Sequence, residues 1–416
     1  MIDSEIFTPC KIGNLTLKNR TIRSAAFENM CRNNRPSQEL FDYHVAVARG
    51  GVAMTTVAYA SVNRSGISFK GQLWLRDEII PELRTLTDAI HREGAKASIQ
   101  LGHCGNMTHF STSGGMPVGA SGGINIYSPT IVRALKEKEI FSIVQDFGKA
   151  VSIARKAGFD CVEIHAGHGY LIGQFLSPYT NRRKDRWGGS LSNRMRFMEQ
   201  VITEVMRVAG NEMTVVVKTN MFDGFKGGMD EEDCLKVARR LEALGVHALV
   251  FSAGFVSKAP MQVMRGAMPI RSLVHYMNPF RYGWLRLSVR LFGKMMIPPV
   301  TYEEAYFLET AKKFRAALKL PLIYVGGMTS REKMEEVLSC GFVAFQMARA
   351  LINDTGFVEK LRQGTLSKSP CGHSNYCIAR MYSKNMQCYH CTEKIPKTIK
   401  KEIEELENRY SDRKKS

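Results

Sequence analysis

No apolar run of the sequence approaches the roughly 20 residues that a membrane-spanning helix needs. The first 20 residues lack the apolar core of a secretory signal. Prolines are few, 14 in 416 residues, and 44% of the residues are hydrophobic, which excludes a disordered chain. The ten cysteines of a chain without a signal indicate reduced thiols or metal ligands, not a disulfide framework. We therefore expect a globular, cytoplasmic protein.

Acidic residues are scarce, since 58 Lys and Arg face 39 Asp and Glu, for a net charge of +19. None lies between Glu242 and Glu303, where the chain carries Lys258, Arg265, Arg271, Arg281, Arg286, Arg290 and Lys294. Such a balance can attract nucleic acid, an acidic membrane surface or anionic substrates. No nucleic-acid-binding motif accompanies the charge, so we expect no nucleic-acid partner.

Short apolar runs alternate with segments of helical period along most of the chain. The predicted strands are Thr21–Arg23, Val52–Ala58, Lys96–Leu101, Cys161–His165, Thr214–Thr219, Ala248–Ser252, Leu322–Val325 and Phe342–Met347. The predicted helices are Asp77–Glu93, Glu139–Lys156, Ser192–Val208, Glu231–Leu244, Tyr302–Ala317 and Arg331–Leu338. Eight such β-then-α units predict an α/β fold, a (β/α)8 TIM barrel.

The barrel is expected to occupy residues 1–365. A Cys-rich extension over 366–391 and a polar tail over 392–416 follow it. In the tail, Ile399, Ile403, Leu406 and Tyr410 recur at helical spacing, which predicts one amphipathic helix.

Two connections are too long to be ordinary loops, one from Thr108 to Lys138 and one from about Phe255 to Val300. Both follow the carboxyl ends of predicted strands, where barrel enzymes keep their active sites, so we expect them to wall the substrate pocket. In the second, residues 261–297 mix Met, aromatic and basic side chains. Its alternation over Leu285–Leu291 suits a strand, and helical packing is equally arguable. The segment suits a pocket for a large apolar substrate, a site for coenzyme A phosphates, peripheral membrane contact, or a solvated flap.

The most specific motif runs from Glu163 to Pro178, at the end of the fourth predicted strand. It brings His165, His168 and Tyr170 within six residues, so that two imidazoles can donate hydrogen bonds to a carbonyl oxygen and a phenol can give up a proton. No carboxylate or third His at suitable spacing supports a metal site there. A pair of structural histidines is the simpler alternative.

This motif and several others together resemble the old yellow enzyme family, particularly its 2,4-dienoyl-CoA reductase-like branch. The resemblance runs from about Phe7 to Leu361. Its other motifs are Ile12–Arg20, Arg23–Ala26, Gln100–Gly105, Asn181–Ser190, Asn193–Arg194, Gly326–Gly327 and Ala348–Arg349.

The resemblance implies an FMN-binding barrel that takes hydride from NAD(P)H and passes it to the C=C bond of an α,β-unsaturated carbonyl compound, an enone. It makes His165 and His168 the residues that polarise the carbonyl and Tyr170 the proton donor. The implied flavin-binding residues are Ser24, Ala25, Ala26, Val57, Gln100 and Lys218, and the implied phosphate-binding residues are Gly326, Gly327, Ala348 and Arg349. A flavin-dependent dehydrogenase or demethylase on the same barrel, or a non-catalytic flavin-binding protein that docks on a membrane, are the alternatives.

The chain departs from that branch after the barrel, where the family has four cysteines for a 4Fe-4S cluster. The thiols here are Cys371, Cys377, Cys388 and Cys391, and Ser374 stands at a ligand position. Four well-placed ligands are needed for a cluster, so unligated thiols are the favoured reading, with a cluster or a zinc site as alternatives. The 25 residues after Cys391 are too few for the branch's FAD domain.

Overall fold

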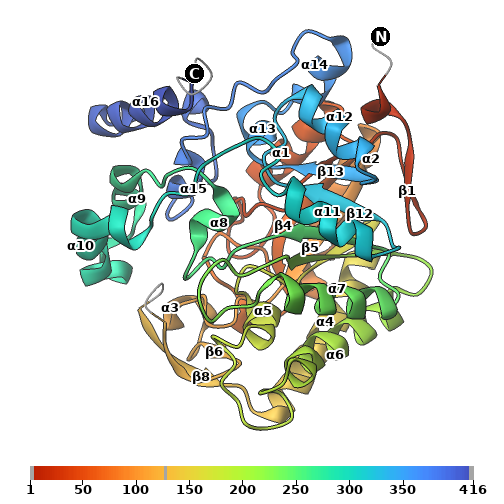
Figure 1. Cartoon of the computed structure of the whole chain (residues 1–416), viewed down its shortest axis with the longest axis vertical. Helices are drawn as coiled ribbons and strands as arrows, with labels where there is room; N and C mark the ends of the chain where they lie inside the picture. Colours follow the sequence, from red (N-terminus) through yellow and green to blue (C-terminus); the bar gives the residue numbers. More distant parts are fainter. Residues whose placement is uncertain (1–3, 126–128, 412–416) are drawn as a thin grey trace.

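The structure, a computed structural model, describes residues 4–125 and 129–411. Eight parallel strands close into a barrel in chain order, and the last pairs with the first, as the sequence predicts (Figure 1). The strands are β3 (Thr21–Arg23), β4 (Met54–Ser61), β5 (Lys96–Gly102), β9 (Cys161–His165), β10 (Thr214–Asn220), β11 (Ala248–Ser252), β12 (Leu322–Val325) and β13 (Ala344–Met347). Nearly all their residues are buried, as expected for parallel strands covered on both faces.

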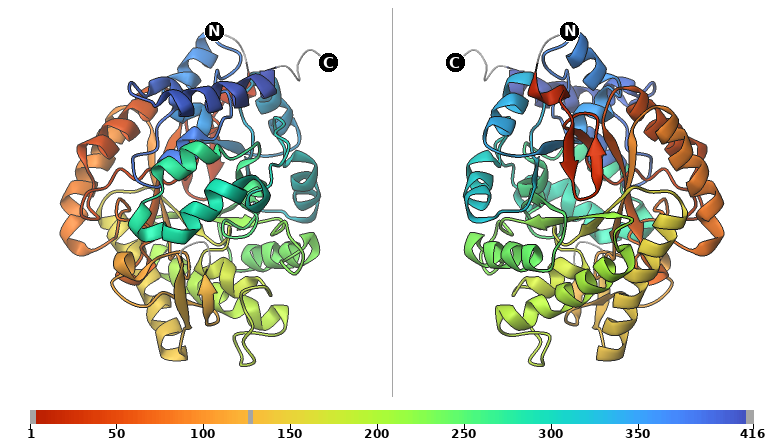
Figure 2. Two further views of the ribbon diagram at one scale, coloured as in Figure 1. Left: turned by 90° about the vertical axis from the view of Figure 1, so that its left-hand side faces the viewer. Right: turned by 90° about the vertical axis from the view of Figure 1, so that its right-hand side faces the viewer.

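Helices surround the barrel (Figure 2). They are α1 (Gln38–Arg49), α2 (Ile80–Arg92), α4 (Glu137–Lys156), α6 (Leu191–Ala209), α7 (Glu231–Ala243), α11 (Leu308–Ala317), α12 (Arg331–Ser339) and α14 (Phe357–Gln363). Several begin at a side chain that caps the first turn, such as Ser37, Ser190 and Asp230. The prediction that a helix starts at Tyr302 is wrong. Residues 302–307 are held against β12, where the Phe307 N–H donates to the Tyr324 hydroxyl (3.0 Å) and Ala305 has a φ of +52°.

A β-hairpin closes the amino-terminal end of the barrel. Its strands are β1 (Cys10–Ile12) and β2 (Leu15–Leu17), which pair antiparallel. Apolar hairpin side chains pack with inward-facing residues near the starts of the barrel strands, among them Met54 and Val216. The barrel interior is therefore filled at this end by hydrophobic packing.

Both long connections carry structure of their own on the carboxyl side of the barrel. The first contains α3 (Phe110–Ser113) and a three-stranded sheet of β6 (Val118–Gly119), β7 (Gly123–Asn125) and β8 (Thr130–Ala134). The second contains α8 (Pro260–Met264), α9 (Ile270–Tyr276) and α10 (Pro279–Met296), which we call the cap. The segment Leu285–Leu291 is thus helical, and α10 kinks at Gly283, whose φ is +24°. The alternation of leucine and arginine there places apolar groups on two faces of one helix.

The carboxyl-terminal part of the chain holds the cap. It contains α15 (Tyr376–Arg380) and the predicted tail helix, α16 (Lys397–Ser411), in which Ile399, Ile403 and Leu406 are buried. Glu402 of α16 accepts hydrogen bonds from the backbone N–H of Arg271 and Ser272 at the start of α9 (2.8 and 2.9 Å). Among the described residues, no helix is both long and apolar enough to cross a membrane.

Candidate active site

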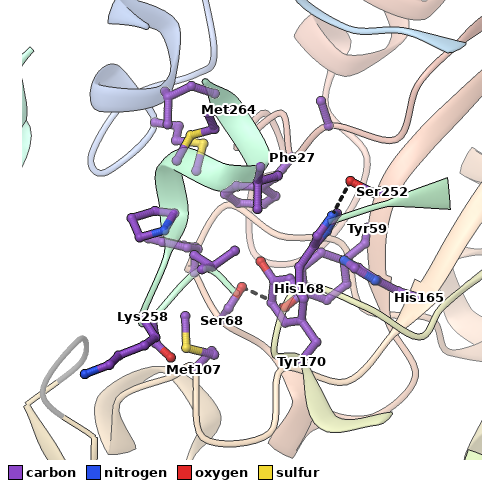
Figure 3. Close-up of a pocket in the computed structure, with 18 of the residues that line it drawn as sticks. Phe27, Tyr59, Ser68, Met107, His165, His168, Tyr170, Ser252, Lys258 and Met264 are labelled. Carbon is purple, nitrogen blue, oxygen red and sulfur yellow. Dashed lines mark hydrogen bonds between the residues drawn. The ribbon is translucent and has the colours of Figure 1, made fainter. Parts of the chain in front are cut away.

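A cavity of about 630 Å³ opens at the carboxyl ends of the barrel strands. This is the size of a cofactor or substrate site, and the position is that of the active site in barrel enzymes. Its lining comes from the ends of the barrel strands, from the first long connection, which we call the excursion after β5, and from the cap (Figure 3). The sequence-predicted residues that line it are Ser24, Ala25, Ala26, Gln100, His165, His168, Tyr170, Lys218, Gly326, Ala348 and Arg349.

A buried ion pair lies at the bottom of the cavity. The Lys218 ammonium is 2.8 Å from Glu163, and both side chains are almost fully inaccessible. Gln100 and Gln346 each donate a hydrogen bond of 2.7 Å to the Glu163 carboxylate. Burial lowers the pKa of Lys218, and the charge of Glu163 opposes that shift. A buried charge pair of this kind is retained only where its partners satisfy it.

Ser24 joins this network, because its hydroxyl accepts from Lys218 (3.3 Å) and donates to Gln346 (3.0 Å). We call Ser24, Gln100, Glu163, Lys218 and Gln346 the polar floor. Three of them were predicted as cofactor-binding residues, and Glu163 and Gln346 were not. The signal for these two residues is a carboxylate and an amide within strands that are otherwise mostly apolar, because charged side chains are seldom buried.

Three predicted catalytic residues converge on one side of the cavity. The ring of His165 lies 4.6 Å from that of Tyr170 and 5.1 Å from that of His168, measured between centroids. A fourth ring, Tyr59, lies 5.1 Å from Tyr170, and its hydroxyl donates to Ser68 (2.9 Å). Sequence reasoning did not find Tyr59, which reaches the cavity after a register shift in β4. Figure 3 shows the four rings, the ring cluster, side by side.

Hydrogen bonds fix both imidazoles. Nδ1 of His165 accepts from the N–H of Gly167 (3.4 Å), which leaves the ring proton on Nε2. Nε2 of His168 shares a hydrogen bond of 2.7 Å with the Ser252 hydroxyl, and the backbone N–H of His168 donates to the Asn220 side-chain oxygen (3.1 Å). Burial lowers the pKa of His168 to about 3 and that of His165 well below its ordinary value. Both rings are therefore neutral near pH 7 and can donate hydrogen bonds as imidazoles.

Glycines and an arginine form the far end of the cavity. Gly326 and Gly327 follow β12 with φ of +135° and +68°, and a Cβ on either would lie within 3 Å of neighbouring atoms. Arg349 begins the short α13 (Arg349–Asn353) after β13, and its guanidinium bonds to Asn375 (2.9 Å). Backbone that approaches closely beside a half-buried guanidinium suits an anionic group such as phosphate.

Two predicted cofactor-binding residues do not line the cavity. The Val57 side chain belongs to the hydrophobic core that β4 shares with residues of α1 such as Val47, because it points away from the barrel interior. Any contact of Val57 with a cofactor would have to come from its backbone. Gly327 lies one residue beyond the lining residue Gly326, against the backbone of Glu303 and Ala305.

The residues that do line the cavity fit a flavin mononucleotide. Lys218 places a cation at the polar floor, Gln100 offers an amide to a heterocycle edge, and the glycine backbone with Arg349 offers an anion site. The cavity is large enough for the cofactor and for a substrate beside it. FMN is the group that this donor set suits.

The four candidate metal-binding cysteines follow the barrel. In the described part of the chain, no group of three or more His, Cys, Asp or Glu side chains is placed to hold a metal ion. Cys388 accepts from Asn353 (3.2 Å), and Cys391 is exposed. Burial raises the pKa of Cys377 to about 12 and that of Cys388 to about 11.

Comparisons with known proteins place the chain in a family. The sequence model of the NADH:flavin oxidoreductase / NADH oxidase family matches residues 5–278, more than half of the chain. A 4,4'-dithiodibutanoate disulfide reductase from Rhodococcus erythropolis is 35% identical over 379 residues, covering 91% of this chain and 93% of that protein. An NADH oxidase from Thermoanaerobacter brockii is 30% identical over 364 residues, or 86% of this chain. The chain spans about half the length of that second protein, 51%.

Solved structures share the fold. A 2-naphthoyl-CoA reductase in complex with 2-naphthoyl-CoA aligns with a TM-score of 0.78 at 23% identity, covering 96% of this chain and 58% of that one. An old yellow enzyme homologue from Zymomonas mobilis aligns with a TM-score of 0.70 at 21% identity, covering 93% and 98%. The expected fold is shared with the old yellow enzyme homologue. The expected family is confirmed: this chain belongs to the NADH:flavin oxidoreductase / NADH oxidase family and is a flavin oxidoreductase that uses FMN and NAD(P)H.

Proposed function

We propose that the protein is an ene-reductase, which uses NAD(P)H to reduce the C=C bond of an α,β-unsaturated carbonyl compound. The observation that carries this proposal is the ring cluster, in which two neutral imidazoles converge with the phenol of Tyr170, beside Tyr59, on one side of a cavity suited to FMN. Bound FMN would supply the redox chemistry, by taking hydride from NAD(P)H and delivering it to the β-carbon of the substrate.

His165 and His168 orient the substrate in this proposal. Their N–H groups donate to its carbonyl oxygen, which gains negative charge as hydride arrives at the β-carbon. The pKa values of both rings lie far below 7, so donation does not depend on a protonated imidazole. The bonds to Gly167 and Ser252 hold the rings before the substrate binds, which avoids reorganisation during the reaction.

Tyr170 completes the reduction by giving its phenol proton to the α-carbon. The product is the saturated carbonyl compound, with one hydride and one proton added, and NAD(P)H leaves as NAD(P)+. Lys218 balances negative charge near the polar floor, where Glu163 fixes its position. The proton is returned to Tyr170 from solvent.

A large apolar enone suits the remaining cavity wall. Apolar residues of the cap and the carboxyl-terminal extension line it, among them Met264, Met268, Leu285, Val289, Ile297 and Met381. Met side chains adapt to irregular shapes, so this wall suits steroid-like or fatty substrates better than small polar ones.

Disulfide reduction is a second candidate. It is favoured by the Rhodococcus erythropolis protein, a disulfide reductase by name, which this chain matches over 93% of that protein's length. Reduction of a disulfide needs no proton at carbon, so Tyr170 would be dispensable for it.

One assay separates the two candidates. Purified protein loaded with FMN is supplied with NADH or NADPH, and with cyclohexenone, a steroid enone or 4,4'-dithiodibutanoate as the acceptor. We expect rapid anaerobic NAD(P)H oxidation with the enones and a product two mass units heavier than the enone. Turnover with the disulfide alone would overturn the ene-reductase proposal.

A further inference from the structure

Helix α10 of the cap is apolar on two opposite faces. Its inner face carries Tyr282, Leu285, Val289 and Gly293, all buried. Its outer face carries Phe280, Trp284, Leu287, Leu291 and Met295, whose exposed fractions lie between 58% and 98%. From Trp284 to Met295 the outer residues recur at intervals of three or four, so they share one continuous stripe, and Phe280 lies before the kink at Gly283. A helix with two apolar faces is normally covered on both.

Only basic charges accompany this stripe. The helix carries Arg281, Arg286, Arg290 and Lys294, and no acidic residue lies between Glu242 and Glu303. Arg290 and Lys294 are exposed beside the stripe. Glu402 of α16 approaches α9 of the cap, and its carboxylate is engaged by backbone N–H groups of that helix.

From this stripe and its charge we infer that the outer face of α10 docks on an anionic lipid bilayer. The helix lies flat in the interface, its apolar stripe among the acyl chains and its cations at the headgroups. It cannot cross the bilayer, since no helix of the described residues is apolar enough. The first turn of α10 contacts the excursion after β5, where Arg281 donates to Thr112 (3.5 Å), and the exposed Phe110 lies in that same excursion.

The charge of this face argues for lipid over a second copy of the chain. Symmetric dimers commonly place the same patch of both subunits against itself. Such an interface would bring two sets of cations together with no carboxylate from this segment to pair them. An anionic bilayer instead complements both the stripe and the cations.

Docking through α10 also bears on how the substrate arrives. Leu285 and Val289 of the same helix wall the cavity, so the helix separates the cavity from the bilayer by its own thickness. Apolar enones dissolved in lipid would then enter beside the cap. This consequence rests on the proposed function, whereas docking itself does not.

Vesicle flotation tests the docking. The FMN-loaded protein is mixed with vesicles of phosphatidylcholine and phosphatidylglycerol, or of phosphatidylcholine alone. We expect binding to the first kind, loss of binding at high salt, and weak binding to the second. The double variant Leu287→Gln/Leu291→Gln, both on the exposed face, lowers the partition coefficient by about tenfold or more.

Trp284 provides a readout at the proposed contact. Of the three tryptophans, Trp187 is buried and Trp74 is half-buried, and Trp284 is 60% exposed on the stripe. We expect brominated lipids to quench its fluorescence, and Trp284→Phe to remove most of the quenching while flotation persists.

A matched pair of charge variants controls for net charge. Arg290→Gln/Lys294→Gln on α10 is expected to weaken vesicle binding. Lys397→Gln/Lys401→Gln on α16 removes the same amount of charge elsewhere and is expected to preserve most of the vesicle binding. Turnover of soluble cyclohexenone is expected to be unchanged in all three double variants, which separates docking from catalysis. Equal flotation of both charge variants, no flotation at all, or a dimer that Leu287→Gln/Leu291→Gln dissolves would each overturn the inference.

Discussion

The floor of the cavity consists of polar side chains, whereas its cap is largely apolar. The polar floor is a closed network in which one buried carboxylate satisfies an ammonium and two amides. The cap is apolar inside and outside, has only basic charges between Glu242 and Glu303, and kinks at Gly283. Strands of the barrel supply the first and a long connection supplies the second. On the proposed function, we expect the barrel to determine the chemistry and the cap to determine which substrates bind.

The largest effect is expected at Tyr170, on the barrel side. Tyr170→Phe removes the proposed proton donor and should slow enone reduction by roughly 10²–10⁴-fold, the usual contribution of a positioned acid. FMN content and the rate of flavin reduction by NAD(P)H should stay the same, which stopped-flow absorbance can measure. Tyr59→Phe removes a neighbouring phenol that bonds to Ser68 and should cost much less. Equal losses in the two variants would remove Tyr170 from its proposed role.

The buried ion pair of the polar floor should contribute more to the free energy of unfolding than an exposed ion pair does. Glu163→Ala leaves Lys218 buried without its partner and should lower the free energy of unfolding by about 3–5 kcal/mol. Urea denaturation followed by circular dichroism measures this loss. Glu232→Ala breaks the exposed pair with Lys236 and should leave the midpoint unchanged. A small effect of Glu163→Ala would mean that water reaches the floor.

Acidification should weaken the barrel side. Burial lowers the pKa of His103 and His168 from 6.5 to about 3, so the unfolded chain binds protons that the folded one excludes. This contribution to stability is complete above pH 6.5 and is lost as pH falls toward 3. At pH 5 the loss of stability amounts to roughly 2 kcal/mol for each histidine.

Thermal unfolding between pH 7 and pH 5 checks this prediction. His168→Asn should reduce the pH dependence of stability by the contribution of one histidine. Substitutions in the cap should leave this pH dependence unchanged. An unchanged slope in His168→Asn would show that this imidazole titrates normally.

The smallest effect is expected in the cap. Val289→Ala widens the apolar wall and should change KM for a steroid enone by a few-fold, about 1 kcal/mol for the lost methyl groups. The constants for cyclohexenone, which does not reach that wall, should stay the same. Steady-state kinetics with both substrates measures the contrast. An equal change in KM for cyclohexenone would contradict the proposal that the cap contacts only large substrates.

The sequence predicts the barrel well because its strands are buried on both faces and read as short apolar runs. Errors fall where tertiary contacts decide the outcome. The run at Phe342 joins β13 only from Ala344, and residues 302–307 have helical spacing but are held by Tyr324. Helix α1 was missed although Ser37 and the glycines after Arg49 mark its ends.

The residues of the candidate site could be predicted where one sequence motif contains them. They could not be predicted where residues from distant strands come together. His165, His168 and Tyr170 follow one strand, so their convergence could be read from spacing. Glu163 lies in the same motif, but its role depends on Gln346, which arrives from the last strand. The conformation of α10 could not be decided from its pattern, because both of its faces are apolar.

The carboxylate that holds α9 comes from 131 residues later in the chain. The cap is thus anchored to the tail helix, and the two segments must be inherited or exchanged together. A chimera that imports the cap of a relative without its matching tail would leave the first turn of α9 uncapped. On the proposed function, we therefore expect substrate range to depend on two distant stretches of sequence, the cap and the tail helix.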